Sequence, residues 1–158
     1  NWYQTNIGSN TNLASKVASG AYYCEQAKVK CDGCTSGSAA MTFRTGYTPD
    51  FKCTTDGNGK GIVNSNIGLI TYDEVVYAGG YFDKNNNNYY LYNPALYWWT
   101  MSPAGVISGH STVHEVSNHG DLAFVYSDES AFLRPVLVLK QDSKVVGSGT
   151  SSDPFVVE

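Results

Sequence analysis

Three histidines in the second half of the chain, His110, His114 and His119, have the residue type and the spacing to suggest a metal site. His114-Glu115 begins as the His-Glu-x-x-His zinc motif does, but that motif needs its second histidine four residues after the first. His119 follows one residue too late and beyond a predicted turn. In a strand, His110 and His114 would share a face. We expect surface histidines on a hairpin and no metal site.

All four cysteines, Cys24, Cys31, Cys34 and Cys53, lie in the first third of the chain, in a polar and glycine-rich stretch. A structural zinc site needs two pairs of ligands, and Cys31-x-x-Cys34 supplies one such pair. Disulfides are therefore favoured over zinc. Four cysteines allow three pairings, and their spacing does not choose among them.

Enzyme signatures are absent from the sequence. It contains no Gly-x-Ser-x-Gly elbow, no phosphate-binding loop and no dinucleotide fingerprint. Asp73-Glu74 is explained by helix capping and Asp128-Glu129 by a turn, so neither forms the carboxylate pair of a glycosidase. The sequence predicts no catalytic residues.

The asparagine run at 85–88 could suggest calcium, because amide and carboxylate oxygens are hard ligands. Only one carboxylate, Asp83, accompanies the run, so a surface loop is the favoured interpretation. Asp56-Gly57-Asn58-Gly59 is similarly typical of a tight turn. We expect no cofactor, and folding and binding that do not depend on calcium.

Composition limits the partners of the chain. The length of 158 residues suits one domain, 1–158, and the net charge of -4 argues against a nucleic-acid partner. No apolar run reaches the roughly 20 residues that cross a bilayer, and we expect no signal peptide within this sequence. A membrane link is expected only through a missing N-terminal segment. Abundant Tyr, Trp, Asn, Ser and Gly are typical of a recognition surface.

Two short helices are predicted, each from a local capping pattern. The first covers residues 12–20, with Asn12 as its N-cap and Gly20 at its end. The second covers residues 72–78, where Thr71 and Glu74 fit a capping box and Gly79 can end the helix.

Short, mostly antiparallel strands are predicted after residue 89, in the runs YYLY, LYWWTMS, TVHEVS, LAFVYS, LRPVLVLK and FVV. Asn118-His119-Gly120-Asp121 has the composition of a hairpin loop. Because adjacent strand residues point to opposite faces, at least one of Trp98 and Trp99 should be buried. Residues 1–67 are expected to hold a helix and cysteine-bearing loops, and residues 68–158 a helix and the strand core.

Several of these runs together resemble a known family. They are similar to the C-terminal domain of bacterial surface proteins of the C-type-lectin-like, formylglycine-enzyme-like group. The runs that carry this resemblance are GLITYDEVVYAGG, YYLY, YWWTMSP, LRPVLVLK and GSGTSSDPFVV. The resemblance is specific over residues 67–158. Before residue 67 it is weaker and rests on the opening WYQTN and on the cysteines at 24 and 53. It implies an α+β, C-type-lectin-like fold with two short helices, short antiparallel strands and much irregular loop. Pairing of Cys24 with Cys53 and of Cys31 with Cys34 is expected.

The resemblance also implies a site. In relatives that are variable proteins of diversity-generating retroelements, the stretch between the Trp-rich strand and the Arg-Pro-Val strand carries the diversified ligand surface. Trp98, Arg134 and Pro135 would belong to the scaffold. Ligand binding would fall to His110, His114, Glu115, Asn118, His119, Asp121, Phe124 and Tyr126.

The chain departs from the family in two respects. The Glu-Pro-Asn and Trp-Asn-Asp calcium motifs of true C-type lectins are absent, and no cysteine follows Cys53, so the enzyme activity should be missing. The leading expectation is an extracellular, non-enzymatic domain of a bacterial surface protein that binds a protein or glycan ligand on another cell or surface. The alternatives are a type IV pilin or pseudopilin head that contacts pilus subunits, and an unrecognised hydrolase.

One detail of the proposed hairpin needs a structural irregularity. Val113 and Val116 have opposite parity, so they cannot both face the core of a regular strand. We expect a bulge or twist near His114-Glu115 that turns both of those side chains outward. Replacing them should then change stability by only about 0.5 kcal/mol, as surface substitutions do.

Overall fold

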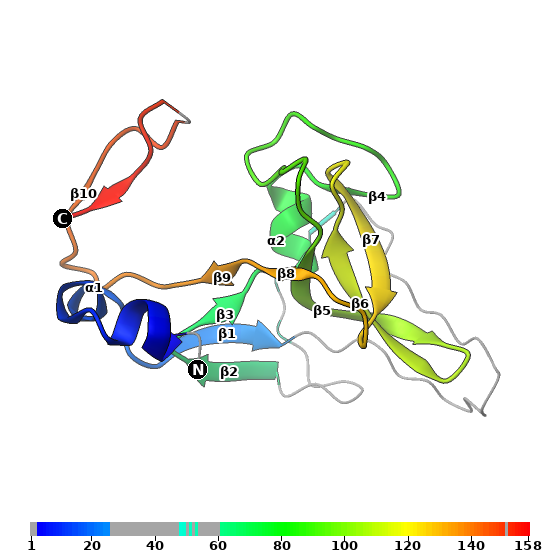
Figure 1. The fold of residues 1–158 in the computed structure, drawn as a ribbon, viewed down its shortest axis with the longest axis horizontal. Helices are drawn as coiled ribbons and strands as arrows, with labels where there is room; N and C mark the ends of the chain where they lie inside the picture. The colour runs from blue at the N-terminus through cyan, green and yellow to red at the C-terminus, as the bar shows by residue number, and fades with distance from the viewer. Residues whose placement is uncertain (1–2, 26–47, 50, 52, 54–60, 151) are drawn as a thin grey trace. The chain divides into compact units, whose positions relative to one another are not determined.

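The chain is a mixed α+β protein, with a few short helices and many strands arranged in small sheets. A computed structural model describes residues 3–25, 48–49, 51, 53, 61–150 and 152–158. These residues divide into two compact units (Figure 1). Unit 1 comprises Asn1–Ala21, Asn64–Ile67 and Leu137–Glu158, and unit 2 comprises Tyr22–Val63 and Gly68–Val136. In the described part of the chain, no helix is long and apolar enough to cross a lipid bilayer.

Unit 1 is built from two short helices and a two-stranded ribbon. A π-helix, η1 (Gln4–Gly8), leads into α1 (Thr11–Lys16), and β10 (Val145–Val146) pairs antiparallel with β11 (Val156–Val157). The predicted N-cap at Asn12 is wrong. Asn10 has the extended backbone of a cap, and its side chain accepts hydrogen bonds from the amides of Asn12 and Leu13.

In unit 2, helix α2 (Tyr72–Tyr77) confirms the predicted capping box. The Thr71 hydroxyl accepts the amide of Glu74, and the Glu74 carboxylate accepts the amide of Thr71 at 2.7 Å. Each side chain thus satisfies a backbone donor at the helix start that has no partner within the helix. At the other end, Gly79 has φ +110°, a conformation that glycine adopts readily, and its amide bonds the carbonyl of Val76.

A five-stranded sheet forms the centre of unit 2, in the order β4-β7-β6-β5-β8. Its long strands are β5 (Trp98–Ile107), β6 (His110–Val116) and β7 (Asp121–Tyr126), which are joined by hairpins. Gly120 in the β6–β7 turn has φ +79°, and a Cβ there would overlap the carbonyl oxygen of Asn86. The predicted hairpin is confirmed, and only glycine fits at this position.

The core of unit 2 lies between α2 and one face of this sheet (Figure 1). Tyr72, Val75 and Val76 from α2 pack with Trp98, Val116 and Leu122 from the sheet and with Leu91. Trp98, Val116 and Leu122 each have none of their surface exposed. The expected burial of at least one of the two adjacent tryptophans is confirmed by Trp98.

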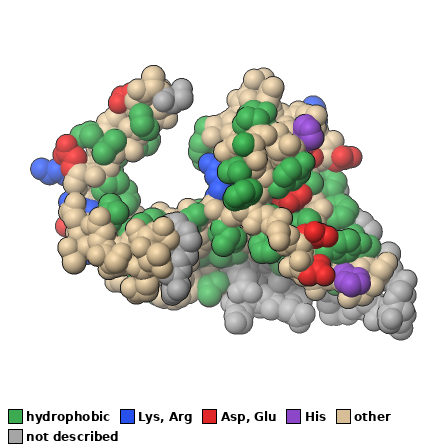
Figure 2. All heavy atoms as spheres, viewed as in Figure 1, with side chains coloured by type: hydrophobic (Ala, Val, Ile, Leu, Met, Phe, Trp, Pro, Cys, Tyr) green, Lys and Arg blue, Asp and Glu red, His purple; other side chains and the backbone are tan. Residues whose placement is uncertain are grey.

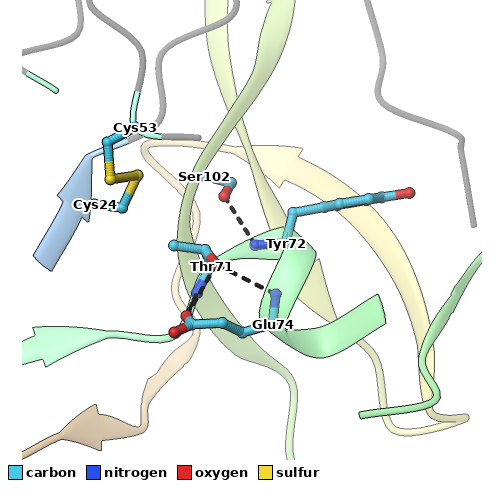
Figure 3. The surroundings of a disulfide bond; sticks show 6 residues. All are labelled: Cys24, Cys53, Thr71, Tyr72, Glu74 and Ser102. Carbon is cyan, nitrogen blue, oxygen red and sulfur yellow. Dashed lines mark hydrogen bonds between the residues drawn. A yellow bond between two sulfur atoms is a disulfide. The ribbon is translucent and has the colours of Figure 1, made fainter. Parts of the chain in front are cut away.

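Strand β5 carries the irregularity of the sheet. The pairing with β6 shifts between Trp99 and Pro103 and again between Pro103 and Gly105. Proline has no amide hydrogen for the ladder, so bulges are where it is tolerated in strands. The Thr100 hydroxyl donates to the carbonyl of His114 at 2.8 Å, and the Ser102 hydroxyl accepts the amide of Tyr72, the first residue of α2 (Figure 3). The irregular segment therefore connects the sheet to the start of α2.

The shorter strands differ from the sequence-based expectation. The run YYLY forms turns, and LRPVLVLK is divided between β8 (Phe132–Leu133), β9 (Pro135–Val136) and a single bridge at Leu139. Parallel pairs also occur, because β4 (Tyr81–Phe82) pairs with β7 and β8 pairs with β5. The remaining strands are β1 (Ala21–Glu25), paired with β2 (Gly61–Ser65), and β3 (Gly68–Leu69), antiparallel to β9.

Candidate functional site

The eight residues assigned to ligand binding do not form one surface. His110 opens β6 and His119 lies in the turn that follows it, so the two are separated by the length of the strand, roughly 20 Å for seven residues. The rings of His110 and Tyr126 pack edge to face, with 5.6 Å between their centroids. Tyr126 also lines a cleft of about 190 Å³. His119 lines a different cleft of about 200 Å³ with Asn85 and Asn87. The turn also contains Asn118, and Asp121 accepts a hydrogen bond from the hydroxyl of Ser117.

The expectation that His114 and Glu115 point to solvent is wrong. His114 is fully buried and Glu115 is 8% exposed. The bulge lies opposite them, in β5, while β6 pairs regularly with β7 through this region. His114 and Val116 therefore keep the core face, and Val113 and Glu115 take the other.

His114 contributes to packing inside unit 2. Its ring lies 4.6 Å from that of Tyr72 and 6.2 Å from that of Phe82, measured between centroids, and Phe124 is its cross-strand neighbour. The Nδ1 atom lies 3.2 Å from the carbonyl oxygen of Ala123, and that hydrogen bond requires the proton on Nδ1. Within the described residues, no group of three or more His, Cys, Asp or Glu is arranged to hold a metal.

Glu115 lies on the opposite face of the sheet, between its strand partners Trp99 and Ala123. Burial raises the pKa of its carboxyl to about 6, and the negative charge of Asp121 adds to the effect. Neither acid lines any of the clefts found among the described residues.

The Glu115 carboxyl should make stability depend on pH. The pKa is about 6 in the folded chain against an ordinary 4.5, so the ionised form is disfavoured by folding. Below pH 4.5 the carboxyl is protonated in both the folded and the unfolded state, so this group does not lower the free energy of unfolding. Above pH 6 the carboxyl is ionised in both states, and its burial then destabilises the folded state by about 2 kcal/mol. Glu115→Gln should therefore be more stable than the wild type at pH 7 by about 1 to 2 kcal/mol, and equal to it near pH 4.

Urea unfolding of both proteins between pH 4 and 8 measures this difference. Asp83→Asn is the matched control, because it makes the same change of acid to amide at an exposed position. A Glu115→Gln variant that is less stable than the wild type at every pH would contradict the assignment.

The disulfide between Cys24 and Cys53 is confirmed. Their Cα atoms are 5.2 Å apart, and 29 positions separate them in the sequence. The expected Cys31–Cys34 disulfide lies outside the described residues. Cys24, Cys53 and the Thr71–Glu74 capping box all line one cleft (Figure 3).

That cleft belongs to a surface that the sequence did not point to. It encloses about 270 Å³ and adjoins a larger cleft of about 680 Å³, since Glu74 and Val136 line both. We call the two together the α2 groove. The side chains that characterise it are Tyr22 and Phe51 in the smaller cleft, Tyr77 and Tyr90 in the larger one, and Glu74 and Val136 between them.

The α2 groove has exposed aromatic walls. Tyr22 is 73% exposed, Tyr77 76% and Tyr90 79%, and the ring of Phe51 packs edge-on against Tyr77 at 5.7 Å. Apolar side chains reach the surface at several places on the face drawn in Figure 2 (green spheres). In the α2 groove, three highly exposed tyrosines line two adjoining clefts. Contiguous exposed apolar surface of this kind marks binding sites.

Distant segments of the chain place these side chains. Tyr77 lies on the side of α2 away from the core, one helical turn after Glu74. The turn that carries Tyr90 is held by Arg134, whose Nη1 donates to the carbonyl of Leu91 at 2.5 Å while its guanidinium lies 4.8 Å from the Trp98 ring. An exposed tyrosine on the polar side of a short amphipathic helix was the one signal in the sequence that could have indicated this surface.

Comparison of the chain with protein-family models, with curated proteins and with solved structures finds no match. Function is therefore inferred from the described residues and from the sequence.

Proposed function

We propose that this chain is an extracellular ligand-binding domain of a bacterial surface protein, with a C-type-lectin-like fold and no enzyme activity. The α2 groove is its binding surface. The observation that carries this proposal is the set of three tyrosines, Tyr22, Tyr77 and Tyr90, that are each more than 70% exposed and line adjoining clefts. Tyrosine offers a large and rigid contact area with a polar tip, which suits recognition of an external ligand.

Two further features support the proposal. The Cys24–Cys53 disulfide is typical of proteins that fold in an oxidising compartment. The resemblance of residues 67–158 to C-type-lectin-like surface domains agrees with a binding role and with the mixed α+β architecture.

Surface staining tests the proposal. The domain is biotinylated, assembled on fluorescent streptavidin and applied to panels of bacterial and animal cells, because tetravalent display reveals weak contacts. We expect staining by the wild type and its loss in the variant Tyr22→Ser/Tyr77→Ser/Tyr90→Ser. Tyr97→Ser is the matched control, since Tyr97 is 44% exposed and lines none of the clefts of the described residues.

Three results would contradict this proposal. The first is an absence of staining by the wild type on every surface. The second is equal staining by the triple variant. The third is that the variant His110→Ser/Tyr126→Ser no longer stains cells while the triple tyrosine variant still does. That result would place the binding site on the β6–β7 hairpin. Melting temperatures of all variants show that each one is folded.

A second candidate function, contact with other subunits of a pilus, is favoured by one observation in unit 1. The β10–β11 ribbon exposes Val145 at 43%, Val146 at 45% and Val156 at 55% of their surface, and Phe155 beside it at 66%. A two-stranded ribbon with exposed apolar side chains can pair with a neighbouring chain. Self-association in analytical ultracentrifugation that is lost in Val146→Glu would favour this role.

A further inference from the structure

We infer that the α2 groove binds a neutral oligosaccharide whose sugar rings have their hydroxyls equatorial, as in β-linked glucose or N-acetylglucosamine chains. This inference rests on the proposed function and adds the chemical class of the ligand. Three properties of the groove carry it: its aromatic walls, one fixed carboxylate, and the absence of cations among its described lining residues.

The aromatic walls suit flat sugar faces. The face of an aromatic ring is electron-rich, so it attracts the weakly positive C–H groups of a ring placed over it. A sugar with equatorial hydroxyls presents its C–H bonds on both faces and its hydroxyls around the rim. Tyr77 and Tyr90 line the same cleft and are each more than three-quarters exposed. Each offers a ring for stacking and a hydroxyl that can bond to the rim.

Glu74 supplies a fixed hydrogen-bond acceptor where the two clefts meet. Its Oε2 atom accepts from the backbone amide of Thr71 at 2.7 Å and from the Thr71 hydroxyl at 2.9 Å (Figure 3). These bonds hold the carboxylate in place, and in the described surroundings they leave Oε1 to accept from a ligand. A carboxylate that accepts from vicinal hydroxyls makes charge-assisted bonds, which are stronger than neutral ones.

The described lining of the α2 groove includes one acidic side chain, Glu74, and no Lys or Arg. Arg134 lines a neighbouring cleft of about 130 Å³, but its guanidinium is stacked on Trp98 and bonded to the carbonyl of Leu91. A neutral ligand with many hydroxyl donors is complementary to this surface.

The dimensions of the α2 groove suit a short chain of sugars. The larger cleft, of about 680 Å³, falls within the range of roughly 300 to 1,000 Å³ typical of small-ligand sites. The smaller cleft continues it past Glu74 and Val136 toward Tyr22. A ligand of several units can therefore contact both aromatic walls.

Isothermal titration calorimetry with defined probes tests the inference. The neutral probes are cellohexaose and chitohexaose, and the charged probes are hexalysine and a heparin hexasaccharide. We expect saturable binding of at least one neutral probe and none of either charged probe. Tyr77→Ala and Tyr90→Ala should each raise the Kd about tenfold or more, since each removes one stacking ring.

Conservative variants distinguish ligand contact from a loss of folding. Tyr77→Phe keeps the ring and should stay within about threefold of the wild type, because only a hydroxyl is lost. Glu74→Gln also completes a capping box, so α2 should persist while the affinity falls. Tyr97→Ala, outside the clefts of the described residues, should bind as the wild type does.

Several outcomes would overturn the inference. Binding of hexalysine with the same dependence on Tyr77 and Tyr90 would assign the groove to a basic peptide. A second outcome is that neither neutral sugar binds, although the triple tyrosine variant still loses cell staining. That outcome would support the α2 groove as the binding surface but reject a neutral oligosaccharide as its ligand. Failure of both the sugars and the staining would reject the proposed function as well.

Discussion

Replacement of both Cys24 and Cys53 by serine should lower the free energy of unfolding by roughly 3 to 4 kcal/mol. The disulfide closes a loop across 29 positions, and without it the unfolded chain regains the conformations that this closure forbids. Total stabilities of single domains are typically only 5 to 15 kcal/mol, so a loss of this size should be visible directly as a lower melting temperature.

Urea unfolding of the wild type and of the double serine variant measures this loss. Cys31→Ser/Cys34→Ser is the matched control, since a disulfide across two intervening residues constrains the unfolded chain much less, with an expected loss of about 2 kcal/mol. Alkylation without reductant, followed by intact mass, should find no reactive thiol in the wild type. Equal losses in the two variants, or four alkylated thiols, would contradict the expectation.

Features whose determinants are close together in the sequence were predictable. The start of α2 depends on Thr71 and Glu74, three residues apart, and both capping bonds form as expected. The β6–β7 turn depends on Gly120, whose positive φ agrees with the hairpin composition. In both cases the signal lies within a few neighbouring residues. The close approach of the Asn86 carbonyl, which also requires glycine at 120, is a tertiary contact that the sequence did not indicate.

Features that depend on the register between strands were not predictable in the same way. Parity led us to expect a bulge in β6 near His114, on the premise that Val113 and Val116 both face the core. That expectation is wrong, because β6 pairs regularly with β7 and Val113 lies on the face opposite Val116. The bulge lies in β5, where Pro103 interrupts the ladder, and this reverses the expected exposure of His114 and Glu115. Pro103, which directly follows the predicted strand run LYWWTMS, was the signal that the bulge belongs to β5.

The α2 groove could not be assembled from sequence, because its walls come from residues far apart in the chain. The smaller cleft is lined by Tyr22 and Phe51, near the disulfide, and the larger one by Tyr77 of α2 and Tyr90 of the Arg134-supported turn. The run that contains Tyr90 has the composition of a strand, yet it forms turns tied to other segments. Strand propensity reflects packing on a sheet, and no sheet neighbour is present for this run in the described residues.

Alanine substitution of two histidines in the same strand should have very different effects. His114→Ala should lower the free energy of unfolding by about 2 to 4 kcal/mol, because it leaves a cavity beside Tyr72 and Phe82 and removes the hydrogen bond to the carbonyl of Ala123. His110→Ala should change it by about 0.5 kcal/mol or less, since His110 is exposed and its ring packs edge-on against the partly exposed Tyr126.

His114→Phe separates the two contributions to the His114 effect. Phenylalanine keeps an aromatic ring against Tyr72 but cannot donate to Ala123, so this variant should lose about 1 to 2 kcal/mol, less than the alanine variant. Urea unfolding at pH 7 measures the free energy of unfolding of each protein. We expect it to decrease in the order wild type, His110→Ala, His114→Phe, His114→Ala. If His110→Ala and His114→Ala were equally mild, His114 would face solvent, and the ligand surface would belong on the β6–β7 hairpin. If His114→Ala is severe while sugar binding by the folded fraction is unchanged, then His114 supports the fold and the α2 groove supports recognition.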